Sequence, residues 1–222
     1  MLKILMVAAI LVGAGPLQAA TVEGTETYDL LFRQGTLNDI GDGSNLVYQR
    51  EVENTLRPEA AERDTGSIAM SFGHGDGKMT NIQFQQETKH RSLGQFPTSV
   101  GNPMIMVFYE SVIRDMAESA GGSPFYIRNR VKDALVQPSE VEEGEAMIDG
   151  ETVATQTIRL HPFAEDPNRD KMKGFGNLEL TVTMSADVPG WYLSLVADTA
   201  GADGAAPVYR SSIAFDRLEA AQ

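Results

Sequence analysis

Apolar and polar residues alternate along several stretches of the chain, which is the pattern of a β-strand with one buried and one exposed face. The clearest stretch is 178–184, where every second residue is apolar. The alternating stretches lie before and after a central region that has a different period. The pattern predicts strands at Tyr28–Arg33, Leu46–Val52, Leu178–Ser185, Trp191–Asp198 and Tyr209–Leu218.

Residues 67–90 predict a hairpin around the glycine-rich segment 75–77. A two-residue turn would set Met70 opposite Gln83 and mix apolar with polar side chains. A three-residue loop with a bulge sets Met70 opposite Ile82 and keeps one face apolar, so we expect the second register. A second hairpin is predicted at Asp149-Gly150, between Glu145–Ile148 and Glu151–Leu160.

The central region has the 3.6-residue period of amphipathic helices. A first helix is expected to begin at Asn102 and Pro103 and to end at the two glycines 121–122. A second helix is expected to begin at Ser123 and Pro124 and to reach about residue 136. The connection is short, so the two helices should form a hairpin. The side chains predicted to point inward are Ile105, Phe108, Tyr109, Val112 and Met116 of the first helix, and Ile127, Val131, Ala134 and Leu135 of the second.

These elements predict an α+β fold in which a curved antiparallel sheet, similar to a half-open barrel, carries an inserted two-helix hairpin on its apolar face. No internal repeat or linker divides residues 21–222, so we expect a single globular domain. Residues 21–27 are expected to form a loose leader. In outline the architecture resembles that of exported lipoprotein carriers, but no sequence motif carries this resemblance, and fold alone is poor evidence for function.

Residues 1–20 have the order of a secretory signal peptide: Lys3, the apolar run Ile4–Val12, and small residues up to Ala20. We expect cleavage near Ala19 or Ala20 and a periplasmic or secreted mature chain. The apolar run is about half the roughly 20 residues of a membrane-spanning helix. The later apolar stretches are shorter still, so no membrane span is predicted.

The composition excludes several classes of function. After removal of Lys3, 17 basic side chains face 31 acidic ones, and so acidic a body is repelled by the phosphates of nucleic acids. The chain contains no cysteine, which excludes disulfides, thiol catalysis and a bacterial lipid anchor. The three histidines, His74, His90 and His161, are far apart in the sequence. We therefore predict no metal site and no cofactor.

Catalytic motifs are also missing from the sequence. There is no nucleophile elbow, zinc-binding helix or phosphate-binding glycine loop. Residues 166–170 place oxygen ligands as a calcium loop does, but Lys171 and Asn177 stand where glycine and glutamate are required, so a polar connecting loop is expected. We assign no catalytic residue. A hydrolase that uses scattered carboxylates is kept as a third hypothesis, and an enzyme is not the favoured interpretation.

The first functional hypothesis is an exported soluble binding or carrier protein that holds an apolar or amphipathic ligand between the sheet and the helical hairpin. Methionine-rich helices adapt to varied guests, and arginine beside aromatic residues can mark the mouth of a ligand site. Arg128 or Lys132 would then lie near the polar end of the ligand. The residues predicted to contact it are Met104, Phe108, Val112, Arg128, Lys132 and Trp191.

The alternative hypothesis explains the same residues without a ligand. The apolar side chains would simply fill the core, and the cations would pair with acidic neighbours. The chain would then be a periplasmic protein–protein interaction or assembly module, and its partner would be another protein of the cell envelope.

Overall fold

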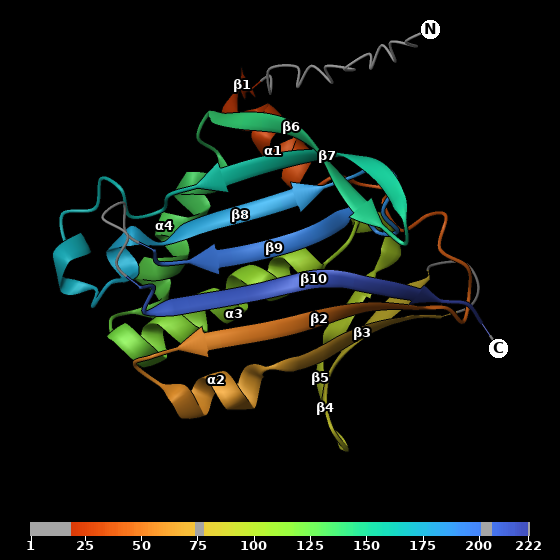
Figure 1. Ribbon diagram of the computed structural model, residues 1–222, viewed down its shortest axis with the longest axis horizontal. Helices are drawn as coiled ribbons and strands as arrows, with labels where there is room; N and C mark the ends of the chain where they lie inside the picture. Colours follow the sequence, from red (N-terminus) through yellow and green to blue (C-terminus); the bar gives the residue numbers. More distant parts are fainter. Residues whose placement is uncertain (1–18, 74–77, 201–205, 222) are drawn as a thin grey trace, which may run out of the picture.

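The computed structural model describes residues 19–73, 78–200 and 206–221. Its main element is an open antiparallel sheet with the strand order β1-β6-β7-β8-β9-β10-β2-β3-β4-β5, and helices α3 and α4 are inserted between β5 and β6 (Figure 1). The predicted α+β class and the inserted helical hairpin are confirmed. The strands are β1 (Ala19–Val22), β2 (Asn45–Asn54), β3 (Gly66–Phe72), β4 (Met79–Gln86), β5 (Lys89–Pro97), β6 (Ser139–Ile148), β7 (Glu151–Leu160), β8 (Glu179–Met184), β9 (Tyr192–Asp198) and β10 (Tyr209–Glu219).

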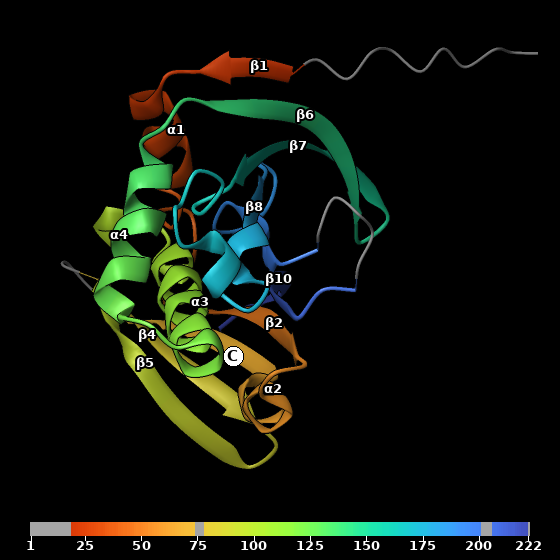
Figure 2. The same ribbon diagram turned by 90° about the vertical axis from the view of Figure 1, so that its left-hand side faces the viewer.

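The sheet curves strongly, and Figure 2 shows β4 and β5 below α3 and β6 and β7 above it. This curvature lets one face of the sheet cover α3 from several sides. Short 3₁₀ turns occupy Thr98–Val100, Arg169–Lys171 and Phe175–Asn177. The helices are α1 (Gly24–Leu31), α2 (Pro58–Asp64), α3 (Met104–Ala120) and α4 (Pro124–Leu135).

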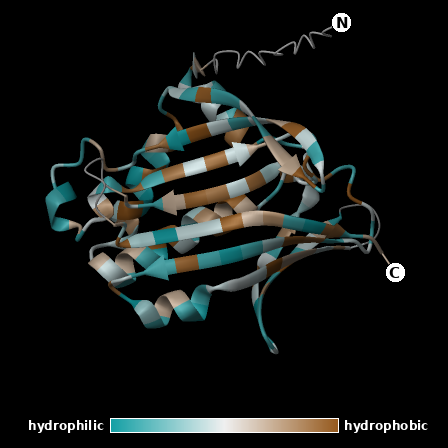
Figure 3. Ribbon diagram, viewed as in Figure 1, coloured by the Kyte–Doolittle hydropathy of each residue, from teal (hydrophilic) through white to brown (hydrophobic). Residues whose placement is uncertain are grey.

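Alternating hydropathy is visible along the central strands (Figure 3), and in β8 every second residue is buried, as its sequence predicts. The predicted register of the hairpin between β3 and β4 is confirmed, since Met70 lies opposite Ile82 and Ile68 opposite Phe84. The tip of this hairpin, residues 74–77, lies outside the described residues. The turn between β6 and β7 has positive φ at both Asp149 and Gly150, as a tight type I′ hairpin turn requires.

The expectation of a leader over residues 21–27 and a strand at Tyr28–Arg33 is wrong. Residues 24–31 form helix α1. The backbone N–H of Glu23 donates to the side chain of Glu26 at 3.3 Å, which is one half of a capping box. The two buried residues of α1, Thr27 and Leu31, are four positions apart and so share one face of the helix. Helix α2 and strand β5 were also not predicted.

Helices α3 and α4 pack their apolar sides inward, as the periodicity predicts. The two sides of α3 differ clearly in their exposure to solvent, since Met106 is 45% exposed while Phe108 is fully buried. Among the described helices, none has both the length and the apolar character needed to cross a bilayer. The predicted inward residues that are buried are Ile105, Phe108, Tyr109, Val112 and Met116 of α3, and Ile127, Val131 and Leu135 of α4.

Candidate functional site

The four apolar residues predicted to contact a ligand lie in the hydrophobic core. Met104 and Phe108 are fully buried, and Val112 and Trp191 are 1% and 5% exposed. All four belong to one continuous cluster of buried side chains. The described surface carries open hollows, and these four residues line none of five of them. The structure therefore gives these side chains packing partners within the fold.

Trp191 forms a hydrogen bond with the C-terminal end of helix α1. Its Nε1–H donates to the backbone oxygen of Leu30 at 3.1 Å, and the hydroxyl of Tyr192 donates to the oxygen of Leu31 at 2.5 Å. The guanidinium of Arg33 lies 4.5 Å from the centre of the Trp191 ring. These contacts satisfy carbonyl groups that the last turn of a helix leaves free, so strand β9 and the residue before it anchor α1.

The two predicted cations lie on α4, and both are accessible to solvent. Arg128 binds Glu110 of α3 with two hydrogen bonds, of 2.8 and 2.6 Å, and this contact lowers the pKa of Glu110. Lys132 is exposed. Arg128 borders an open hollow of about 430 Å³ between α3 and α4, whose apolar lining includes Ile113. The six predicted residues do not converge on one hollow.

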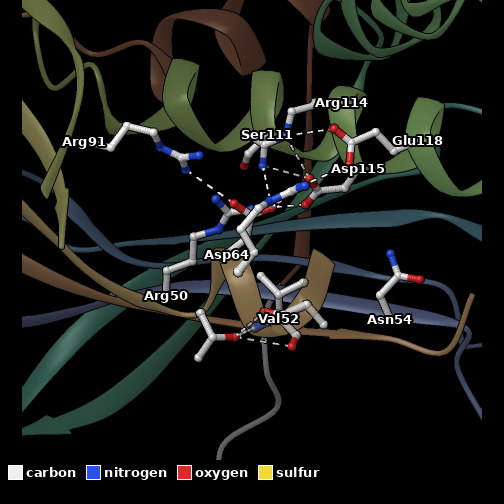
Figure 4. A network of polar contacts seen from close by, with 12 residues as sticks. Arg50, Val52, Asn54, Asp64, Arg91, Ser111, Arg114, Asp115 and Glu118 are labelled. Atoms are coloured by element: carbon white, nitrogen blue, oxygen red, sulfur yellow. Dashed lines mark hydrogen bonds and ion pairs between the residues drawn. The ribbon is translucent and has the colours of Figure 1, made fainter. Parts of the chain in front are cut away.

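Sequence reasoning missed a network of buried charges between the sheet and α3 (Figure 4). Arg50 of β2 and Asp115 of α3 are 2% and 4% exposed, and the Arg50 guanidinium donates to the Asp115 carboxylate at 3.1 Å. The hydroxyl of Tyr209, on β10, donates to the same carboxylate oxygen at 2.9 Å. Arg114 adds a further hydrogen bond of 2.9 Å to the other oxygen. The carboxylate of Asp115 thus joins two strands to the helix.

A second buried carboxylate lies at the end of α2. Asp64 is 1% exposed and receives hydrogen bonds from Arg63 at 2.7 Å, Arg114 at 3.1 Å and Arg91 at 3.3 Å. Arg91 comes from β5 and Arg114 from α3, so Asp64 connects three elements. Arg114 contacts both buried carboxylates, and it therefore links the two halves of the network.

Burial and the nearest opposite charges shift the pKa in opposite directions for Arg50 and Asp64, whereas burial and the charge of Asp115 shift the pKa of Tyr209 in the same direction. Burial lowers the pKa of Arg50, against the opposing effect of Asp115. Burial by itself would raise the pKa of Asp64, but the hydrogen bond from Arg63 and the nearby guanidinium groups outweigh it, so that pKa is lowered. Burial, together with the negative charge of Asp115, raises the pKa of Tyr209 well above its ordinary value. Tyr209 is therefore a stable hydrogen-bond donor at neutral pH.

Two further buried contacts fix the ends of α3. At its start, the Asn102 amide donates to the Tyr48 hydroxyl at 2.9 Å and to the Gly190 oxygen at 2.7 Å. At its end, Asn54 of β2 donates to the Ser119 hydroxyl at 2.8 Å. Helix α3 is thus attached to the sheet at its beginning, its middle and its end.

The two largest of the five hollows lie side by side and share Arg159, His161 and Ala164 in their linings. Their volumes are about 570 and 630 Å³, and many of the residues that line them are charged. Most of these charges are already paired within the fold. Arg159 binds Glu142, Arg210 binds Asp198 at 2.5 Å, and Arg130 binds Asp166 at 3.0 Å.

In the segment that resembles a calcium loop, residues 166–170, the first carboxylate is already hydrogen-bonded within the protein. Asp166 accepts hydrogen bonds from the Tyr126 hydroxyl at 2.7 Å and from the backbone N–H of Asn168 at 2.8 Å. Within residues 19–73, 78–200 and 206–221, no group of three or more His, Asp or Glu side chains is placed to hold a metal ion.

The chain was also compared with known proteins. No model of a protein family matches it, and no curated protein matches it either. The function is therefore inferred from the geometry of this chain.

Proposed function

We propose that this chain is an exported interaction module that binds another protein of the cell envelope through its surface, and that it encloses no ligand. The observation that carries the proposal is the place of Met104, Phe108, Val112 and Trp191. These are the residues best suited by sequence to face an apolar guest, and each packs within the hydrophobic core. Protein interiors are close-packed in general, so side chains buried in the core are poorly placed to line a lipid-sized site.

The attachment of α3 supports the same proposal. A carrier that loads a ligand between α3 and the sheet needs the helix to move away from the strands. Such a movement would break the buried pair of Arg50 and Asp115, and a charge that loses its partner inside a protein is destabilising. It would also break the contacts of Asn102 and Ser119. The helix is built as a fixed part of the core.

The arginines on the outer surface are poorly placed to bind the charged group of an amphipathic ligand, because carboxylates of the protein already bind them. The guanidinium groups that border the hollow between α3 and α4 belong to Arg114 and Arg128. Arg114 is bound to Asp64 and Asp115, and Arg128 is bound to Glu110. A charged headgroup would therefore compete with carboxylates that already neutralise these cations.

The proposal is tested by asking what the exported protein carries. Protein purified from the periplasm is extracted with organic solvent, and the extract is analysed by mass spectrometry. The control is the same protein after unfolding, solvent washing and refolding. We expect no stoichiometric lipophile and no gain in fluorescence from a lipophilic dye in either sample. A lipid present at about one molecule per chain would overturn the proposal and favour the carrier hypothesis.

The positive test uses cross-linking in intact cells, with residue-specific photoreactive side chains placed at exposed positions on α4, β5 and β6. An interaction module predicts one reproducible adduct from one surface and none from the others. Equal, weak labelling from all three surfaces would contradict a specific interface.

A further inference from the structure

Strand β6 has an open edge over most of its length. β1 pairs with residues 139–142 of β6 and with no others, while β6 continues to Ile148. Among the described residues, no strand pairs with 143–148 on the side away from β7. The backbone donors and acceptors on that side are free to accept a further strand, which is how many domains bind extended peptides.

The opposite edge of the sheet, β5, is built differently. Its pairing with β4 contains an irregularity between Ile82 and Gln83, Gly94 has a φ of +132°, and the strand ends at Pro97. Bulges, prolines and edge cations are devices that prevent edge-to-edge pairing. The pairing of β6 with β7 has no such irregularity, so β6 is the more receptive of the two edges.

The charge of β6 selects the kind of strand it can accept. The strand carries Glu140, Glu142, Glu143 and Glu145. Glu142 is bound by Arg159, whereas the other three form no ion pair within the described part of the chain. Two copies of β6 side by side would bring acidic side chains together, which is unfavourable between paired strands. Lysine or arginine on the incoming strand would be favourable.

Maturation would lengthen the open edge. The sequence predicts cleavage near Ala19 or Ala20, and both residues belong to β1. A chain that begins at Thr21 keeps only the pairs of Thr21 with Glu140 and of Val22 with Ser139. The free part of β6 would then begin at Val141 rather than at Glu143.

We propose that residues 141–148 of β6 accept an extended segment of another exported protein as an additional strand, and that this segment carries lysine or arginine at alternate positions. The inference rests on the proposed interaction function and names its surface and its partner chemistry. Backbone hydrogen bonds supply the binding, and the glutamates exclude a second copy of this chain and acidic segments.

The experiment uses the mature protein and a synthetic ten-residue peptide of alternating lysine and valine, with the glutamate–valine peptide as its charge control. Isotope-labelled protein is titrated by NMR, and affinity is measured by fluorescence anisotropy. We expect amide shifts in β6 with the lysine peptide and no binding of the glutamate peptide. Amide shifts confined to β5 would overturn the proposal. So would no binding of the lysine peptide at about 1 mM, a concentration high enough to detect even weak affinity.

A matched pair of variants separates edge binding from general attraction to an acidic protein. E143K/E145K reverses two exposed charges on β6, and E51K/E53K reverses two exposed charges with the same spacing on β2, which is paired on both sides. We expect the first to weaken binding by about tenfold or more and the second to change it by less than about twofold, since distant charges are screened. Equal weakening in both would overturn the proposal.

The outcome is separable from that of the proposed function. A stoichiometric lipid in the purified protein contradicts the interaction module itself, whatever the peptide does. A specific adduct from α4 or β5, together with no peptide binding, leaves the module intact and contradicts the β6 edge alone. Thermal unfolding of the two charge variants checks that both fold as the parent chain does.

Discussion

Arg50 on β2 and Asp115 on α3 form an ion pair of 3.1 Å in the interior of the protein. The Asp115 carboxylate also accepts a hydrogen bond from the Tyr209 hydroxyl, so it has partners from two strands. Removing charges from water is costly, and hydrogen bonds to both carboxylate oxygens of Asp115 offset part of that cost, whereas the buried Nε of Arg50 has no partner within the described residues. This geometry makes the pair a fixed point of the fold and a sensitive place for mutation.

Replacing Arg50 alone should destabilise the protein strongly. In Arg50→Met the Asp115 carboxylate keeps Arg114 and Tyr209 but loses its buried cation, and we expect a loss of about 3–5 kcal/mol in the free energy of unfolding. The measurement is urea unfolding followed by circular dichroism.

The paired replacement R50M/D115L is the control. It removes both charges and fills the space with apolar atoms, but it leaves the Tyr209 hydroxyl without its acceptor, so it should recover part of the loss and not all of it. Additive losses from the two single substitutions would contradict a direct coupling between Arg50 and Asp115.

Asp64 should make stability depend on pH in the acid range. Its pKa is lowered from the ordinary value of 3.8 in the folded protein, so the unfolded chain takes up the proton first as the pH falls. The stability contributed by Asp64 is present above about pH 5 and is lost as the pH falls through 3.8 and then through the lower folded value. The free energy of unfolding of Asp64→Asn should therefore decrease less steeply as the pH falls than that of the parent chain.

The comparison uses Asp29→Asn as control, at an exposed position of α1. Unfolding free energies are measured between about pH 3 and 7, the range in which carboxyl groups titrate. An equal decrease in the free energy of unfolding with falling pH in the parent chain and in Asp64→Asn would show that the three arginines do not hold Asp64 in its charged form.

Much of the fold could be predicted from the sequence because its signals are local. The alternation in β8 and the match of Met70 with Ile82 depend on neighbouring residues only. Helix α1 was missed because Tyr28, Leu30 and Phe32 alternate as strand residues do. The signal for a helix was the pair Glu23 and Glu26 at the start of α1, which has the three-residue spacing of a capping box. It was weak, because glutamate stands where that motif usually has serine or threonine.

The buried charges could be found only in part. Arg50 lies two residues from both Tyr48 and Val52 in β2, so the alternation of a strand places all three side chains on the buried face. A charged residue at such a position signals a buried partner. The identity of that partner could not be derived, because Arg50 and Asp115 are 65 positions apart and meet only through the curvature of the sheet around α3.

Asn102 should be the most important uncharged polar residue at the start of α3. Its side chain donates to Tyr48 and Gly190 and accepts from the backbone N–H of Met104. Asn102→Ala leaves these groups without their partner, and we expect a loss of about 2–4 kcal/mol. As a control, Asn45→Ala removes one 3.5 Å hydrogen bond at a half-buried site and should cost less than about 0.5 kcal/mol.

Two tyrosines provide a matched test of how buried hydroxyl groups act in this core. Tyr109 is 4% exposed, and its hydroxyl has no hydrogen-bond partner within the described residues. Tyr209 is fully buried, and its hydroxyl binds Asp115 at 2.9 Å. Burial raises the pKa of both phenols, so neither is ionised at neutral pH, and phenylalanine removes only the oxygen in each case.

Tyr109→Phe should therefore stabilise the protein by about 1 kcal/mol, because an unsatisfied buried hydroxyl is lost. Tyr209→Phe should destabilise it by about 1.5–3 kcal/mol, because a hydrogen bond to a charged carboxylate is lost. Urea unfolding of the two variants measures both effects against the same parent chain. A loss of stability in Tyr109→Phe as large as that in Tyr209→Phe would mean that the Tyr109 hydroxyl has a partner in solution, and the interior next to α3 would then be more polar than the packing of Phe108 and Val112 indicates.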